Sequence, residues 1–191
     1  ARKKVSVETP SVLAVATAPI FPAARSDLDA SELSDLARCF WAKTGGGAGA
    51  WLSVVQHLMD AADIAEKLFD GYLSEHHRRD GDQSKARASF VFLAGVHDAG
   101  KVSPQFACQS AELAELIRDQ GISVMRKKDY AERAFLPHGL VSQFTFQELV
   151  GAGGGDTGRA REWAILVGIH HGRYPDSDAV RVAHQVGAGA R

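Results

Sequence analysis

Apolar residues recur every three or four positions through much of this chain, which is the spacing of one face of an α-helix. The stripe is clearest in residues 51–69, which the pattern predicts to be one helix. Its apolar positions are Val54, Leu58, Ala61, Ala65 and Leu68. His57 falls beside this stripe, so we expect its side chain at the edge of the buried face.

Start and stop signals predict the other helices. Asp29-Ala30-Ser31-Glu32 is typical of a capping box that opens a short helix through Phe40. Ser84 is the expected N-cap of a helix that ends near Asp98. Three more helices are expected: one opened by Ser103-Pro104 and running through Ile117, one from Pro137 to about Val150, and one over residues 159–171 with Gly172 at its C′ position.

The segment from Phe90 to Val96 is apolar at every position. A helix that is apolar on all sides is normally buried all round, and we expect such burial here. A short buried strand is the competing interpretation. The helix is favoured by the good helix formers immediately upstream, Lys85, Ala86, Arg87 and Ala88.

No segment alternates apolar and polar residues as a half-buried strand would, so the sequence predicts an all-α fold. We expect an orthogonal bundle of about seven helices. Residues 1–28 contain three prolines and no clear period, and they are expected to form an extended lead-in. Residues 29–191 are expected to form one domain, since a chain of 191 residues suits a single core.

The overall charge argues against a broad nucleic-acid-binding surface. The net charge is -1 and the isoelectric point is about 6.8, whereas such surfaces are usually strongly basic. Short basic clusters such as Arg126-Lys127-Lys128 are expected to be solvated. Any attraction for nucleic acid must therefore come from a local site.

Cysteine content and hydropathy limit the cellular compartments in which the protein is expected. Cys39 and Cys108 are too few and too far apart for a disulfide framework. No apolar run approaches the roughly 20 residues that cross a bilayer. We therefore expect a soluble, cytoplasmic protein without a membrane partner.

Imidazoles and one carboxylate recur along the chain, and together they indicate a metal site. They are His57, His97-Asp98, His138 and His170-His171. Neutral imidazole suits Fe, Mn, Co, Ni and Zn, whereas Mg and Ca prefer oxygen ligands. Asp98 could give one oxygen to each of two ions about 3.5–4 Å apart. One or two divalent transition-metal ions are the expected cofactor.

Such a site would reconcile the slightly acidic chain with an anionic substrate. Two divalent ions balanced by one carboxylate leave a pocket charge of about +3, which attracts a phosphodiester. Taken alone, His57 would more often be a histidine at the edge of the core, and a His-Asp dipeptide occurs by chance in many proteins. The combination, in this order, is what favours a metal site.

These motifs resemble the HD nuclease domain of the CRISPR-associated helicase–nuclease of type I systems. The resemblance spans about residues 33–175 and rests on Trp41-Ala42-Lys43-Thr44, His57 with Asp60, His97-Asp98-Ala99-Gly100-Lys101, Ser103-Pro104-Gln105-Phe106, His138-Gly139 and His170-His171-Gly172. It implies an HD-type helical bundle. It also implies a metal-dependent endonuclease that hydrolyses single-stranded DNA in CRISPR interference, and hence a role in antiviral defence.

The resemblance implies roles for individual side chains. His57, His97 and Asp98 would hold one ion. The other ion would be held by four side chains: Asp98, His138, His170 and His171. Asp98 and Lys101 would be catalytic, with Lys101 contacting phosphate or assisting the leaving oxygen. A helix-end lysine that meets free carbonyls is the alternative for Lys101.

The resemblance also implies partners: single-stranded DNA, a helicase domain of the same polypeptide and a Cascade-type surveillance complex. No G-x-x-x-x-G-K-[ST] loop occurs here, so the helicase region is absent. The family pattern has a further aspartate well downstream, but only Asp176 and Asp178 follow the paired histidines. We therefore expect a fragment of a longer polypeptide, truncated at its C-terminal end, in which the first ion position is weak.

Two alternative functions remain open. One is an HD phosphohydrolase of nucleotides or cyclic dinucleotides, because residues 171–175 faintly resemble the HD-GYP phosphodiesterases, although Gly-Tyr-Pro itself is absent. The other is a non-catalytic docking module, which the missing downstream aspartate would allow. Cleavage of a cyclic dinucleotide would identify the first, and a metal-free purified protein would identify the second.

Overall fold

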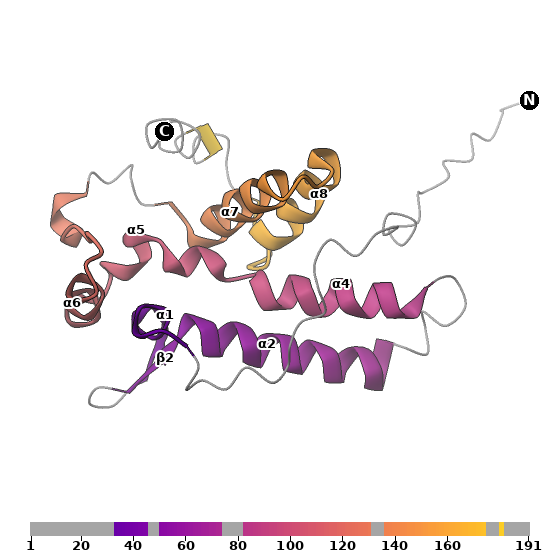
Figure 1. Ribbon diagram of the computed structural model, residues 1–191, viewed down its shortest axis with the longest axis horizontal. Coiled ribbons are helices and arrows are strands. Elements are labelled where there is room, and N and C mark those ends of the chain that lie inside the picture. The colour runs from indigo at the N-terminus through magenta and orange to yellow at the C-terminus, as the bar shows by residue number, and fades with distance from the viewer. Residues whose placement is uncertain (1–32, 46–49, 74–81, 131–135, 175–179, 182–191) are drawn as a thin grey trace, which may run out of the picture.

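The computed structural model describes residues 33–45, 50–73, 82–130, 136–174 and 180–181, and it is mostly helical (Figure 1). Its α-helices are α1 (Asp35–Cys39), α2 (Val54–Leu68), α4 (Gln83–Val96), α5 (Pro104–Ala107), α6 (Ala111–Asp119), α7 (His138–Ala152) and α8 (Thr157–Gly168). These seven helices of the described residues confirm the predicted all-α class and helix number. The predicted lead-in, residues 1–28, and the predicted capping box lie outside the described residues.

A short hairpin departs from the all-helical expectation. Strand β1 (Trp41–Thr44) pairs antiparallel with β2 (Trp51–Ser53). The predicted start of a helix at residue 51 is therefore wrong, because Ser53 is the N-cap of α2 and accepts a hydrogen bond from the Gln56 amide at 3.1 Å. Helical periodicity over the following residues masked a three-residue strand that only its pairing partner stabilises.

Helices α2 and α4 lie antiparallel along the long axis of the molecule (Figure 1). The prediction of Ser84 as the N-cap of α4 is wrong, since the carboxylate of Asp82 accepts hydrogen bonds from the amides of Ser84 and Lys85. At the other end, α4 stops at Val96 with His97 as its C-cap. The His-Asp pair therefore sits at a helix end, as the sequence predicts.

The prediction that Phe90 to Val96 is buried on every side is wrong. The segment is helical, which excludes the strand alternative, but no residue of α4 is fully buried and Phe90 is 37% exposed. Helices α2 and α8 pack against α4 without enclosing it. The uncovered side forms an apolar groove of about 400 Å³ that is lined by Ala61, Phe90, Leu93, Ala94, Leu166 and Val167 together with His97 and His170.

The chain directly after Asp98 forms a short turn and two helices. A 3-10 turn, η4 (Ala99–Val102), leads to Ser103, which caps α5 as predicted by accepting a hydrogen bond from the Phe106 amide at 3.4 Å. The predicted single helix is interrupted, because Ser110 caps a new helix, α6. Two further turns in the described chain are η3 (Phe69–Leu73), a π-helical extension of α2, and the 3-10 turn η5 (Lys127–Asp129).

Helices α7 and α8 pack closely against each other. Pro137 precedes the first residue of α7, as predicted. Helix α8 begins after the N-cap Asp156 and ends at Gly168, three residues before the predicted end at residue 171. His170 and His171 therefore lie in a turn beyond the helix. The prediction of Gly172 at the C′ position is wrong, because Ile169 is the C-cap, although Gly172 does have a positive φ of 72°.

Two apolar cores flank the polar site. One combines the hairpin, α1, α5 and α6, and the other lies between α7 and α8 with α4 beside them. Both cysteines are buried and free, in agreement with the prediction of no disulfide framework. Among the described helices, none combines the length and the apolar character that a bilayer crossing requires.

Candidate metal centre

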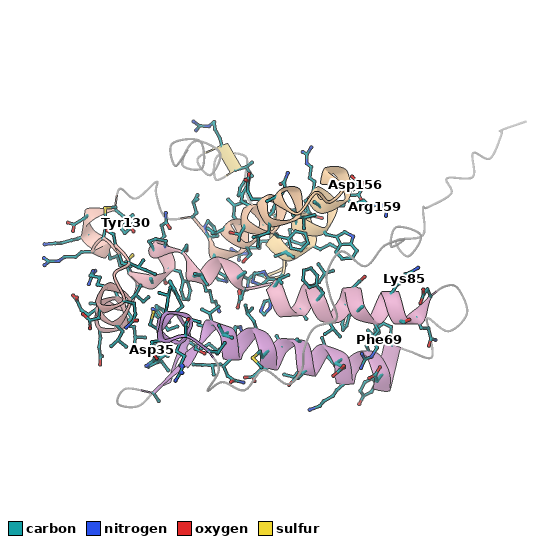
Figure 2. The ribbon with its side chains drawn as sticks, in the orientation of Figure 1. Asp35, Phe69, Lys85, Tyr130, Asp156 and Arg159 are labelled. Atoms are coloured by element: carbon teal, nitrogen blue, oxygen red, sulfur yellow. The ribbon has the colours of Figure 1, made fainter. Side chains whose placement is uncertain are left out.

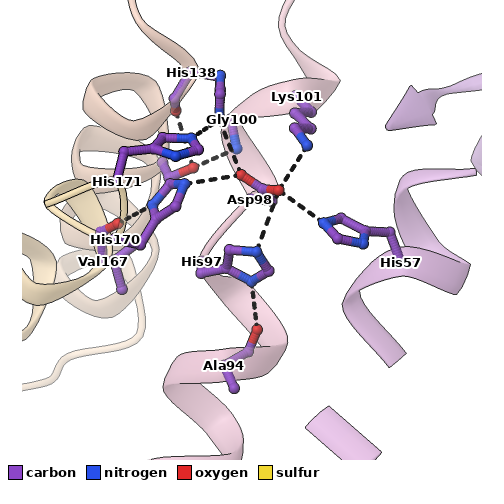
Figure 3. A network of polar contacts seen from close by, with 11 residues as sticks. His57, Ala94, His97, Asp98, Gly100, Lys101, His138, Val167, His170 and His171 are labelled. Atoms are coloured by element: carbon purple, nitrogen blue, oxygen red, sulfur yellow. Dashed lines mark hydrogen bonds and ion pairs between the residues drawn. The ribbon is translucent and has the colours of Figure 1, made fainter. Parts of the chain in front are cut away.

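The six predicted ligands and Lys101 lie in one cluster where several elements meet (Figure 3). His57 belongs to the first turns of α2. His97 and Asp98 connect α4 to η4, which carries Lys101. His138 is the first residue of α7, and the turn after α8 supplies His170 and His171. The fold therefore joins residues that are more than a hundred positions apart.

Asp98 stands at the centre of this cluster and is only 3% exposed. Its Oδ2 lies 2.8 Å from Nε2 of His57 and 3.2 Å from Nε2 of His97. The ammonium of Lys101, also buried, lies 2.7 Å from the same oxygen. One carboxylate oxygen thus faces two imidazoles and one cation.

The second oxygen of Asp98 faces a different group of imidazoles. Its Oδ1 lies 3.1 Å from Nε2 of His138 and 3.1 Å from Nε2 of His170. His171 lies further out, with its Nε2 2.8 Å from Nε2 of His138. The carboxylate therefore separates the five imidazoles into two groups, His57 and His97 at Oδ2, and His138 and His170 at Oδ1 with His171 beside His138.

The rings of His97 and His170 are oriented by the same local contact. Nδ1 of His97 lies 2.7 Å from the carbonyl oxygen of Ala94, and Nδ1 of His170 lies 2.7 Å from that of Val167. A carbonyl can only accept, so each Nδ1 carries a proton, and in the neutral ring Nε2 keeps its lone pair. Both lone pairs then point toward Asp98, itself an acceptor.

This donor arrangement fits a bound cation. Among the described residues, Asp98 Oδ1 and His170 Nε2 are buried polar atoms without a hydrogen bond, although they lie 3.1 Å apart. Two acceptors held face to face repel each other unless a positive charge lies between them. Two ligand groups have donor atoms within 4.8 Å of one another: Asp98 with His138, His170 and His171, and His57 with His97 and Asp98.

The surroundings of Asp98 keep it ionised. Burial by itself would raise the pKa of this carboxyl. The opposing effect comes from the side-chain contacts of Asp98, among them the ammonium of Lys101 at 2.7 Å, which together hold the pKa of this carboxyl far below its usual range. A carboxylate that stays charged near neutral pH is a ready metal ligand.

The imidazoles respond to their positions in different ways. Burial lowers the pKa of His57, although the contact with Asp98 partly opposes this. Burial also lowers the pKa of His171, and the neighbouring imidazoles lower it further. The contact with Asp98 raises the pKa of His97. A lowered pKa favours the neutral form of His57 and His171, which is the form of imidazole that binds a metal ion.

Aromatic residues support one wall of the cluster. The indole N–H of Trp41 donates to the carbonyl of Ala107 at 3.3 Å, and the Trp41 ring packs on Phe106 with centroids 4.5 Å apart. The Phe106 ring contacts the His138 ring edge-to-face at 5.5 Å. The ammonium of Lys101 lies 5.5 Å from the Phe106 centroid, within cation–π distance. The hairpin thus helps to hold two residues of the cluster.

Not every residue that the motifs contain joins the cluster. Asp60 lies outside it and accepts a hydrogen bond from Gln56 at 2.7 Å. Asp176 and Asp178 lie outside the described residues. Sequence reasoning overlooked Ser142, which is fully buried beside the cluster. Its spacing of four residues from His138, on one face of a helix, is the signal that could have indicated it.

Comparison with known proteins gives two matches. The profile of the family described as Cas3, HD domain matches residues 41–190. A curated relative, the CRISPR-associated nuclease/helicase Cas3 of Streptococcus thermophilus, is 26% identical over 157 residues, which cover 72% of this chain and 16% of the relative. The chain thus spans about a sixth of the length of that relative. No solved structure matches it significantly.

Proposed function

Because the chain belongs to the Cas3 HD domain family, we propose that it is a metal-dependent nuclease that hydrolyses phosphodiester bonds of single-stranded DNA in CRISPR interference. The observation that carries the proposal is one buried carboxylate, Asp98, whose two oxygens face two groups of imidazoles. Such a bridging carboxylate suits a pair of ions acting on a phosphate. The proposed partners, besides single-stranded DNA, are a helicase portion of a longer polypeptide and a Cascade-type complex.

The proposed ligands follow from the two oxygens of the carboxylate. His57 and His97 would hold one ion with Asp98. Four side chains would hold the other: Asp98, His138, His170 and His171. The imidazole-rich set favours Fe, Mn, Co, Ni or Zn over Mg or Ca. When bound, such ions supply Lewis acidity, which polarises the phosphodiester and activates water.

The charges of the protein itself make substrate binding depend on the metal. The negative charge of Asp98 and the positive charge of Lys101 lie 2.7 Å apart and cancel. This ion pair by itself therefore offers no net charge to a phosphate. Attraction for DNA therefore comes from the ions, and Lys101 is the proposed side chain that donates to a phosphate oxygen beside them.

The test compares cleavage of single-stranded DNA by metal-depleted protein before and after addition of manganese or cobalt. Asp98→Asn should lower the metal-restored rate at least about a thousandfold, since it removes the ligand shared by both ions. Asp70→Asn is the matched control, because Asp70 is an exposed carboxylate paired with Arg87 away from the cluster. Wild-type cleavage by Asp98→Asn would refute the proposal.

A second variant guards against loss of folding. His171 is exposed, so His171→Ala should remain folded while the four-ligand group loses one donor.

Faster hydrolysis of a cyclic dinucleotide than of single-stranded DNA would favour the small-molecule phosphohydrolase. A purified protein without metal and without cleavage would favour the docking module.

A further inference from the structure

Ser142 is a buried polar residue that joins two segments of the cluster. Its side chain is 0% exposed and lies one helical turn after His138 in α7. The hydroxyl oxygen accepts a hydrogen bond from the backbone amide of Gly100 at 2.8 Å. The same hydroxyl donates to the carbonyl of His138 at 3.0 Å. One side chain thus connects the turn after Asp98 to the residue that begins α7.

The contact at Gly100 leaves no room for a side chain. A Cβ atom at this position would collide with the carbonyl oxygen of His138. It would also lie 2.5 Å from the amide nitrogen of Ser142 and 2.9 Å from its hydroxyl oxygen. Real Cβ atoms essentially never approach other atoms so closely. The η4 turn and α7 are therefore in direct backbone contact, and the Ser142 hydroxyl fills that contact.

The first turn of α7 also lies close to the end of α8. A Cβ atom at Gly139 would lie 2.7 Å from the carbonyl oxygen of Gly168 and 3.3 Å from Cε1 of His170. The segments that carry Asp98, His138 and His170 thus meet through backbone contacts at two glycines. Such contacts leave little freedom for one segment to shift relative to the others.

We propose that Ser142 is a positioning residue that fixes the separation of Asp98 and His138, and so sets the metal affinity of the four-ligand group. The contacts form a closed path from the Asp98 backbone through Gly100, Ser142 and His138 back to Asp98 Oδ1. His57 is not on this path, because it reaches Asp98 from α2. The inference rests on the proposed metal site but not on the choice of substrate.

The experiment titrates metal-depleted protein with cobalt and follows the visible absorption of the bound ion together with equilibrium dialysis. Ser142→Ala should lower the affinity for one of two cobalt ions about 10- to 100-fold, which is the usual loss when a residue that orients a metal ligand is removed. The other ion should change less than about threefold, and the spectrum of the weakened ion should change. Ser110→Ala is the matched control, because its hydroxyl also accepts a backbone hydrogen bond, from Leu113 at 3.3 Å, but at the start of α6.

Unchanged affinities in Ser142→Ala, or equal losses for both ions, would overturn the inference while leaving the proposed function intact. Absence of cobalt binding by the unaltered protein would overturn both. If Ser142→Ala fails to fold, amide hydrogen exchange of the unaltered protein tests the connection instead. The Gly100 amide should exchange far more slowly than an unprotected amide, and rapid exchange would refute the hydrogen bond to Ser142.

Discussion

The antiparallel pair of α2 and α4 carries a charged cluster at each end, and the two clusters differ in their exposure to solvent and in how their polar atoms are paired. At the outer end, near Phe69 and Lys85 in Figure 2, Arg87 pairs with Glu66 at 2.6 Å and Asp70 at 2.8 Å. Those side chains are 38–53% exposed. At the inner end the side chain of Asp98 is 4% exposed.

The difference shows how to tell a structural polar cluster from a binding site. At the outer end each charge has an opposite partner and water, and the pKa of Arg87 is raised by the hydrogen bonds to Asp70 and Glu66. At the inner end, acceptor atoms of Asp98 and His170 face each other without a hydrogen bond in the described structure. Satisfied and solvated charges stabilise weakly. Buried and unsatisfied ones indicate a missing partner.

The largest expected effect comes from breaking the inner cluster. In the metal-free protein, Asp98→Asn leaves the ammonium of Lys101 buried without its counter-charge, which should lower the free energy of unfolding by about 3 kcal/mol. The double variant Asp98→Asn/Lys101→Met should recover most of this loss, because no unpaired charge remains. Urea unfolding with chelator present measures both. Equal stability of the single and double variants would contradict the assignment of a buried ion pair.

Added metal should stabilise the folded protein only through the cluster at the inner end of α2 and α4. At about 100 times its dissociation constant, an ion that binds only the folded state adds about 2.7 kcal/mol, which is about 5–11 °C in Tm for a chain of this size. Thermal unfolding with and without cobalt should show this shift in the unaltered protein and in Arg87→Met. The shift should disappear in Asp98→Asn/Lys101→Met. An equal shift in all three proteins would place the ion elsewhere.

The outer cluster should contribute much less. Arg87→Met should lower the free energy of unfolding by less than about 1 kcal/mol, because its ion pairs are more than a third exposed and water screens them. High salt should reduce the difference further. Urea unfolding at low and high salt measures it. A loss as large as that of Asp98→Asn would remove the contrast between the two ends.

The smallest effect is the pH dependence at the outer end. The hydrogen bond from Arg87 lowers the pKa of Asp70 below its ordinary 3.8. A carboxyl with a lowered pKa stabilises the folded state above its ordinary pKa, and that stabilisation is lost as the pH falls through the folded-state value. The small Tm difference between the unaltered protein and Asp70→Asn should therefore be constant above about pH 5 and vanish in stronger acid. A difference that grows on acidification would have the wrong sign.

Local signals in the sequence were enough for most helices. Pro137 and Ser103-Pro104 predicted helix starts correctly, because a fixed φ and a side-chain cap act within one turn of the chain. The hairpin was missed, since a strand of three residues is stabilised by pairing across the chain. The incomplete burial of Phe90 was missed for the same reason. An apolar sequence shows that burial of the helix is favourable. It does not show how many neighbouring helices the fold packs against it.

The candidate site was predictable in its members but not in its construction. The combination of five histidines and one aspartate in this order was enough to predict that they form a cluster. The sequence gives no means of seeing that Asp98 divides its oxygens between two groups. Nor could the sequence show that Trp41 and Phe106 support one wall of the cluster, or that Ser142 connects the turn after Asp98 to the start of α7. These contacts exist only in the folded chain.

The early end of α8 has a consequence for chelation. Consecutive side chains in a helix diverge by about 100°, so two neighbouring imidazoles held there would face different directions. In the turn after Gly168 the ring centroids of His170 and His171 are 4.1 Å apart, and both rings face His138. Gly172, directly afterwards, has a positive φ, and its amide donates a hydrogen bond to the carbonyl of Ile169 at 2.7 Å, which closes the turn. The early end of the helix thus brings two adjacent imidazoles to face the same neighbour, which is the arrangement that the proposed four-ligand group needs.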